Sequence, residues 1–154
     1  MHTWFECKIR YEKTMENGMN KKVTEPYLVD ALSFTEAEAR IIEQMAPYIS
    51  GEFTVRDIKR ASYSEVFYTD EEVADKWYKG RLEFVTLDEK SGKEKITYTN
   101  VLVQACDFRD AVKKLDVGMK GSMADYVIVL MQETAIMDVY EYEQTEDPNQ
   151  DENI

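Results

Sequence analysis

The sequence predicts an α+β protein made of two pseudo-symmetric ββαβ repeats, with antiparallel strands in one or two sheets and the helices on one face. Two similar helix-start phrases, "ALSFTEAEAR" at 31–40 and "ACDFRDAVKK" at 105–114, stand 74 residues apart. Around each phrase the apolar residues recur with the period of strands, and within it with the period of a helix. Two turn segments, "ENGMN" and "KSGK", divide the preceding strand regions into hairpins.

The first repeat, residues 1–68, opens with a hairpin. Its first strand begins at Trp4. Asn17 and Gly18 predict a tight two-residue turn, because both residue types tolerate the positive φ that such a turn needs. The second strand contains Pro26. A proline cannot donate a ladder hydrogen bond, so this strand is expected at a sheet edge or at a bulge.

The first helix is expected to begin with a capping box. Ser33 and Glu36 stand three residues apart, which is the spacing that satisfies the first amides of a helix. Ala37, Ile41 and Met45 follow at a spacing of four and form one apolar stripe. This stripe is expected to face a sheet.

A long strand is expected over 52–68, followed by a short joining helix. The apolar parity of the strand shifts near residues 56–57, which predicts a β-bulge there. Thr69 and Glu72 resemble a second capping box, so a helix is expected over 70–77. This helix would join the two repeats.

The second repeat, residues 77–142, restarts the same order of elements. Strands are expected over 81–89 and 95–105, and the last strand over 125–142. Asp107 is expected to cap a helix that ends at Gly121. The residues of that helix expected to face inward are Phe108, Ala111, Leu115 and Met119. Residues 1–142 are thus predicted to form a single α+β domain.

The two repeats can be aligned residue by residue. At a spacing of 74, the coinciding apolar pairs are Val29–Val103, Ala31–Ala105, Phe34–Phe108, Ala37–Ala111, Ile41–Leu115, Met45–Met119, Val55–Val129 and Ala61–Ala135. At a spacing of 73, they are Trp4–Trp77, Ile9–Leu82 and Tyr11–Phe84. We interpret this match as an internal duplication. Each repeat is expected to have strand order 2-1-3, all antiparallel, with its helix on one face of the sheet.

Charge is distributed unevenly along the chain. The net charge is −12, and residues 141–154 contribute six acids and no Lys or Arg. Residues 143–154 are therefore expected to be a disordered acidic tail. The two cysteines and a polar N-terminus favour a reducing cytoplasm without secretion. No apolar run reaches the roughly 20 residues that a membrane-spanning helix needs.

The chain contains no motif typical of a catalytic or metal site. His2 is the only histidine and stands at the terminus, where residues are usually mobile. Together with Cys7 and Cys106 it would leave a zinc ion short of ligands. None of the six glycines forms a phosphate-binding loop. We expect no metal, no cofactor and no enzymatic activity.

One segment, "VRDIKRASY", stands out as a candidate binding strip. It sets Arg56, Lys59, Arg60 and Tyr63 along the third strand of the first repeat. At the positions of the first three, the second repeat is expected to have Leu130, Glu133 and Thr134. A charge difference between two similar repeats is typical of a surface that has acquired a use. The alternative is a strand edge whose charges prevent aggregation.

Three functions are weighed, in this order. The first is a non-enzymatic binding or accessory protein that acts through a curved sheet surface on an unknown ligand or a protein partner. The second is a single-stranded nucleic-acid-binding protein, since basic and aromatic side chains on a sheet bind backbone and stack bases, with the acidic tail competing for the strip. The third is a small hydrolase that uses carboxylates, although "TDEEVAD" and "LDEK" also fit a helix start and a turn. A homodimer is left open.

Three stretches carry a resemblance to a known family. They are "WFECKIRYEKTMENG", "VTEPYLVDALSFTEAEARI" and "ETAIMDVY". Together they resemble an uncharacterised bacterial or phage family, a domain of unknown function. The resemblance spans nearly the whole chain short of the acidic tail. It implies a bacterial or phage origin and no particular activity.

Overall fold

A computed structural model describes residues 2–122 and 124–142, which form two helices and eight strands. The first half contains β1 (Trp4–Thr14), β2 (Asn20–Asp30), α1 (Phe34–Met45) and β3 (Phe53–Ala61). The second half contains β5 (Lys76–Leu87), β6 (Glu94–Ala105), α2 (Phe108–Gly118) and β7 (Tyr126–Glu133). Two short strands, β4 (Glu65–Phe67) and β8 (Val139–Tyr140), follow the halves. The predicted α+β class is confirmed, and the predicted acidic tail, 143–154, lies outside the described residues.

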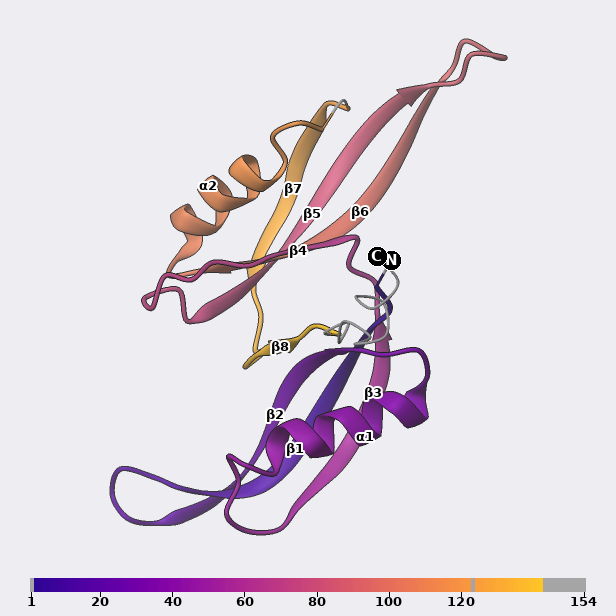
Figure 1. The fold of residues 1–154 in the computed structure, drawn as a ribbon. Coiled ribbons are helices and arrows are strands. Elements are labelled where there is room, and N and C mark those ends of the chain that lie inside the picture. The colour runs from indigo at the N-terminus through magenta and orange to yellow at the C-terminus, as the bar shows by residue number, and fades with distance from the viewer. Residues whose placement is uncertain (1, 123, 143–154) are drawn as a thin grey trace, which may run out of the picture.

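The eight strands form two four-stranded sheets, one on each side of the molecule's middle (Figure 1). Their strand orders are β3-β1-β2-β8 and β4-β6-β5-β7. In each sheet the third strand of a half lies beside the first, which is the predicted order 2-1-3. One helix packs on each sheet, α1 on the first and α2 on the second.

The short strands correct the prediction of two long strands and of purely antiparallel sheets. The segments 52–68 and 125–142 each break after the third strand, and the chain crosses to the other sheet. There β4 pairs in parallel with β6, and β8 pairs in parallel with β2. Each half therefore supplies the fourth strand of the other half's sheet. Apolar periodicity indicates a strand but not the sheet that the strand joins, so the sequence could not reveal this exchange.

The two halves correspond in register as well as in order. The third strand of the first half has its bulge opposite Lys8 and Ile9, and that of the second half opposite Arg81 and Leu82, 73 residues later. The bulge predicted near residues 56–57 is confirmed by the pairing of β3 with β1. The duplication itself remains a prediction.

The same register corrects the alignment of the third strands. Val55 lies opposite Ile9, and Ile128 lies opposite Leu82, so the third strands align at a spacing of 73 and not 74. The positions equivalent to Arg56, Lys59 and Arg60 are therefore Val129, Gln132 and Glu133. The slip arises because the turn after α2 is one residue shorter than the turn after α1.

The predicted joining helix over 70–77 is wrong. Residues 68–75 form a loop with one turn, and Trp77 already lies in β5. The Thr69 hydroxyl accepts a hydrogen bond from the backbone of Glu71 at 3.3 Å, two residues on, where a capping box would reach three residues on. The side chain of Gln104 fixes the loop instead, since it accepts from the backbone N–H of Thr69 and donates to the carbonyl of Ala74, both at 3.1 Å.

The first hairpin differs from the tight turn that was predicted. Its loop has five residues, 15–19, and among the described residues with positive φ only Gly18, at 81°, belongs to it. Asn17 instead accepts a hydrogen bond from the backbone of Met19. The edge position predicted for Pro26 is confirmed. Beyond residues 28 and 29, where β8 pairs, β2 is the edge of its sheet.

The helices begin where the sequence predicts. Ser33 and Asp107 cap them, each accepting from the backbone three residues on. The predicted inward residues Ala37, Ile41, Met45, Ala111 and Leu115 are buried, whereas Met119 is only partly buried. Phe108 is wrong as an inward residue, since it is 54% exposed, like its equivalent Phe34 at 49%. Both occupy the first helical turn, before the stripe reaches the sheet. α2 ends at Gly118, before Gly121.

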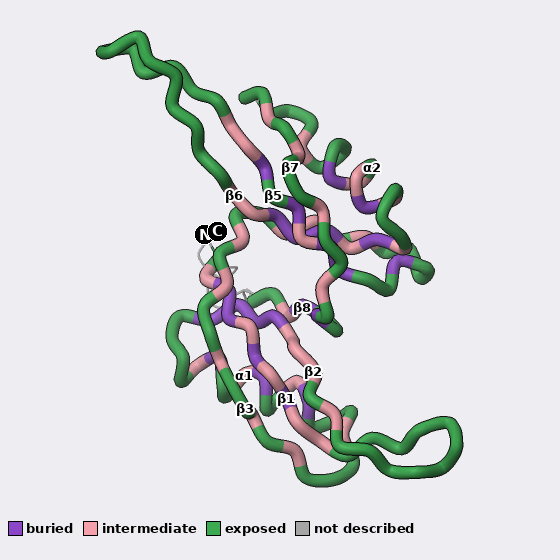
Figure 2. Tube along the Cα trace, turned by 180° about the vertical axis from the view of Figure 1, so that it is seen from behind, coloured by how far each residue is buried: buried purple, intermediate pink, exposed green. Residues whose placement is uncertain are grey.

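A shared apolar cluster joins the two halves, in addition to the core between each helix and its sheet (Figure 2). This seam core consists of Trp4, Leu28, Trp77, Leu102, Ile136 and Val139. Its members pair across the halves, Trp4 with Trp77 and Leu28 with Leu102. The two sheets thus meet around a pseudo-twofold axis.

Candidate functional site

Each sheet has one face covered by a helix and one face without a helix, which we call the open face. In β1, Phe5, Cys7 and Ile9 pack in the core beneath α1. Successive side chains of a strand point to opposite sides, so Trp4 and Glu6 belong to the open face. Near the pseudo-twofold axis the open faces of both sheets approach each other through the seam core.

A pocket of about 430 Å³ lies where the two halves meet, and we call it the central pocket. Its lining comes from both sheets and from both segments that cross between them. The lining residues are Glu6, Lys59, Arg60, Ala61, Ser62, Tyr63, Lys79, Asn100, Gln132, Glu133, Thr134 and Ala135. The pocket therefore exists only because the two halves are interlocked.

Equivalent positions of the two halves differ in charge around this pocket. Glu6 corresponds to Lys79. Lys59 corresponds to Gln132, and Arg60 to Glu133. Three cations and two acids consequently line the pocket. The asymmetry means that the pocket, although built by two similar halves, presents a directional electric field to a ligand.

The charged side chains of the central pocket have different partners. The Lys59 ammonium lies 3.3 Å from the Glu6 carboxylate. The Arg60 guanidinium lies 5.9 Å from the centre of the Phe5 ring. Lys79 has no ion-pair partner within 4 Å among the residues that the structure describes. Two of the three cations are thus available to an anionic ligand.

Tyr63 contributes a neutral hydroxyl to the central pocket. Burial, and then the nearby Glu6 carboxylate, raises the pKa of Tyr63 to about 12. The phenol therefore stays protonated at neutral pH and can donate a hydrogen bond. Its ring packs against the seam core, which holds the hydroxyl in place.

The structure brings together three of the four predicted strip residues. Lys59, Arg60 and Tyr63 line the central pocket. Arg56 lies at the bulge and lines a separate hollow of about 740 Å³ between the β1–β2 hairpin and the turn before β3. The analysis of the first repeat missed Lys79, which the second half contributes. The signal was present in the repeat alignment, where Lys79 takes the place of Glu6.

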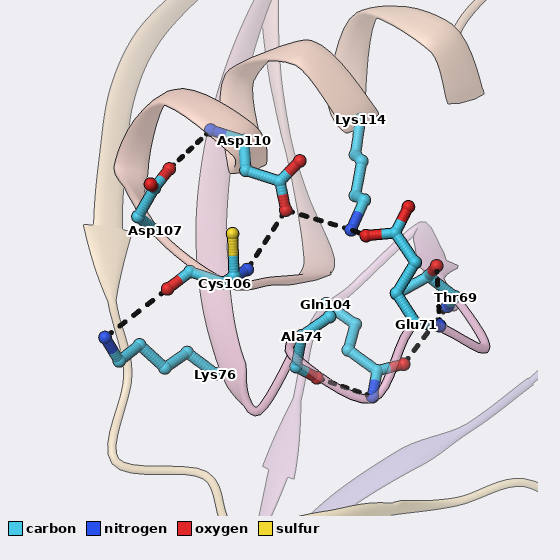
Figure 3. Close-up of polar contacts among 9 residues, drawn as sticks. All are labelled: Thr69, Glu71, Ala74, Lys76, Gln104, Cys106, Asp107, Asp110 and Lys114. Carbon is cyan, nitrogen blue, oxygen red and sulfur yellow. Dashed lines mark hydrogen bonds and ion pairs between the residues drawn. The ribbon is translucent and has the colours of Figure 1, made fainter.

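A polar network fastens the loop after β4 to the start of α2 (Figure 3). The Lys114 ammonium lies 2.8 Å from Glu71 and 2.9 Å from Asp110. Asp110 also accepts a hydrogen bond from the backbone of Cys106 at 3.0 Å. In the first half, Arg40 takes the position of Lys114 and donates to the carbonyls of Asp30 and Glu141. Both networks tie a crossing segment to a helix, which is a structural task.

Neither cysteine is an activated nucleophile. Burial, and then the Glu6 and Asp57 carboxylates, raises the pKa of Cys7 to about 12. Burial and the hydrogen bond to Asp110 raise the pKa of the Cys106 thiol as well. A thiol reacts through its thiolate, so both side chains stay in the unreactive form at neutral pH.

His2 is held in place, contrary to the expectation of a mobile terminal residue. Its Nδ1 contacts the Asp30 carboxylate, and its Nε2 lies 3.0 Å from the Glu141 carboxylate. His2 therefore joins the N-terminus to β2 and to the segment after β8. Within residues 2–122 and 124–142, no three His, Cys, Asp or Glu side chains lie close enough together to hold a metal ion.

The fold and the pocket define an α+β protein of two interlocked ββαβ halves with a polar pocket between them. The chain belongs to the family described as Domain of unknown function (DUF4494), whose model matches residues 3–142. No curated protein and no solved structure matches the chain. In the described part of the chain, no helix is long and apolar enough to cross a membrane.

Proposed function

We propose that this protein is a non-enzymatic binding protein whose ligand places an anionic group in the central pocket. The observation that carries the proposal is the convergence of three cations from both halves on one pocket, with only Lys59 held in an ion pair in the described structure. A charged hydrogen bond to a partly desolvated anion is stronger than one between neutral groups. Arg60 and Lys79 supply that charge.

Neutral groups around the cations would orient the ligand. Tyr63, Asn100 and Thr134 add hydroxyl and amide groups to the same pocket. With its pKa raised to about 12, the Tyr63 hydroxyl donates rather than repelling an anion. A volume of about 430 Å³ suits a small molecule or the end of a larger one. Because both halves line the pocket, a bound ligand would also stabilise their association.

Single-stranded nucleic acid is a weaker proposal. Such binding needs a continuous basic groove with aromatic rings on which bases can stack. The predicted strip is divided between two hollows, and the Tyr63 ring packs against the seam core. These positions favour a compact anionic group over an extended strand.

The test is isothermal titration calorimetry of the full chain with inorganic phosphate, a dicarboxylate and a short single-stranded oligonucleotide. We expect an anionic probe to bind, and Lys79→Gln to weaken its binding about tenfold, as the loss of one charged hydrogen bond predicts. Arg56→Gln, outside the central pocket, is the matched control and should leave binding unchanged. Failure of all three probes to bind would contradict the proposal. Oligonucleotide binding weakened equally by both variants would support the nucleic-acid function instead.

A further inference from the structure

The β5–β6 hairpin extends beyond the rest of its sheet as a two-stranded ribbon (Figure 1). The third strand, β7, stops at Tyr126, opposite Phe84. From residue 85 to residue 98 every side chain of the hairpin is exposed, so the ribbon has no support on either face (Figure 2). A two-stranded ribbon alone is marginally stable in water.

Apolar side chains gather on one face of this ribbon and on the adjoining part of β7. We call this surface the apolar ribbon face, and its members are Val85, Leu87, Ile96, Tyr98, Val127 and Leu130. Their exposed fractions range from 41% for Leu130 to 68% for Leu87. A contiguous exposed apolar surface of this kind is typical of an interaction site.

The strand register places these residues on a single face, the open face of the second sheet. Val85 lies directly opposite Ile96. Glu83 lies between Tyr98 on one neighbouring strand and Val127 on the other. The intervening Leu82 and Phe84 pack on the other side, in the core beneath α2. The apolar surface therefore adds nothing to the core of the protein itself.

The first half shows that the fold does not need this surface. The equivalent positions of the β1–β2 hairpin and β3 hold Glu12, Thr14, Lys22, Thr24, Thr54 and Asp57. All six are polar. The same backbone is thus compatible with a fully polar face, so the apolar residues of the second half serve something outside the monomer.

The charges of the face are complementary to the face itself. Its bases, Lys79 and Arg81, lie at the end near the molecule's middle, and Glu94 lies at the outer end, opposite Leu87. The turn at 88–93 holds two acids and two lysines and adds no net charge. A twofold axis across the ribbon between the levels of Glu83 and Val85 would bring Arg81 of one copy to Glu94 of the other.

We propose that two copies of this chain associate through the apolar ribbon face, packed face to face across that twofold axis. Such an interface is isologous, so each contact between unlike residues occurs twice. The apolar residues of both ribbons are covered in the middle, and the Arg81–Glu94 contacts flank them on both sides. Arg81, whose guanidinium lies 4.4 Å from the centre of the Tyr98 ring, is already positioned on this face. The proposal does not depend on the central pocket.

The test is sedimentation equilibrium of the full chain across a wide dilution series. We expect a species of twice the 18.0 kDa chain mass. Ile96→Lys and Val127→Thr, which install the residues of the equivalent first-half positions, should each weaken association at least tenfold. Lys22→Glu, at the matching site of the first hairpin, should leave it unchanged. Circular dichroism should show all variants folded, since the ribbon contributes no core residue.

A charge exchange tests the orientation of the two copies. Arg81→Glu alone and Glu94→Arg alone should each weaken association, and the double variant should restore it, because every changed contact is again between opposite charges. A wild-type chain that stays monomeric at all concentrations overturns the proposal. A dimer that tolerates Ile96→Lys and Val127→Thr places the interface elsewhere and overturns it too. A double variant without recovery overturns the twofold arrangement.

Discussion

At the scale of single residues, two alanines set the distance between helix and sheet. Ala37 and Ala111 occupy equivalent places, and neither is exposed at all. Each packs in the apolar core beneath its helix. A small side chain at these positions lets the helix approach the strands closely, as the sequence alignment of the repeats predicted.

A larger side chain at either alanine should force the helix away from its sheet. We expect Ala37→Leu and Ala111→Leu each to lower the free energy of unfolding by about 1–3 kcal/mol, the usual cost of overpacking a core. Urea denaturation monitored by circular dichroism measures the change. Ala39→Leu, at an exposed position of α1, is the control and should change stability little. Unchanged stability in both buried variants would contradict the close packing.

Residue patterns predicted the helix-facing side chains well but the pocket only in part. Ala37 and Ile41 could be recognised because a helix repeats its buried face every three to four residues. Lys79 could not, because the pocket joins residues that lie on different strands of different sheets. Nothing in the local sequence states which strands will meet. Phe108 was misplaced because a periodic pattern does not show where along a helix the sheet begins.

At the scale of elements, local chemistry decided what could be predicted. The helix starts follow from Ser33 and Asp107, whose side chains satisfy the first amides. The joining helix failed because the side chain of Gln104, 30 residues beyond Ala74, holds the loop in an irregular shape. The strands β4 and β8 are too short to be recognised by period, and their pairing is set by the seam core rather than by neighbours in sequence.

The network at the start of α2 should make stability depend on pH. The backbone N–H of Cys106 and the Lys114 ammonium hold the pKa of Asp110 below its usual range. A carboxyl with a lowered pKa in the folded state stabilises that state above its unfolded pKa, and this contribution is lost as the pH falls through the folded pKa. Stability from Asp110 is therefore present at neutral pH and declines below about pH 4.

Replacement of this carboxylate tests the contribution. We expect Asp110→Asn to lower the free energy of unfolding by roughly 1–2 kcal/mol at neutral pH, because hydrogen bonds to a charged group are lost. The difference from the wild type should shrink as the pH approaches about 3. Urea denaturation at a series of pH values measures both. Glu89→Gln, exposed in the β5–β6 turn, is the control. A difference that stays constant with pH would show that the charge of Asp110 is not what matters.

At the scale of the whole molecule, the exchange of β4 and β8 makes the two halves dependent on each other. Each half contains a hairpin, a helix and a third strand, which might be taken for an independent unit. Its sheet nevertheless ends in a strand from the other half. Its seam-core side chains, such as Trp4 and Leu28, are covered by residues of the other half. The interlocking, and not the repeat alone, determines the stable unit.

Division of the chain in the exposed turn at residues 72–73 tests this dependence. The fragments 1–72 and 73–154 each lose one parallel strand and the cover of the seam core. Burial of Trp4 and Leu28 contributes roughly 3–6 kcal/mol at about 1.5–3 kcal/mol each, a large share of the roughly 5–15 kcal/mol that stabilises a typical domain. We therefore expect each fragment alone to be largely unfolded, and an equimolar mixture to refold.

Tryptophan fluorescence reports on both fragments, because Trp4 lies in the first and Trp77 in the second, and both are buried in the intact protein. Separately, each fragment should emit at the long wavelength of a solvated indole and unfold in urea without a cooperative transition. The mixture should emit at the shorter wavelength of the intact chain and regain a cooperative transition whose midpoint rises with fragment concentration, since association now drives folding. A fragment that unfolds cooperatively alone with a buried tryptophan would show that its half is self-sufficient and that the exchanged strand is dispensable.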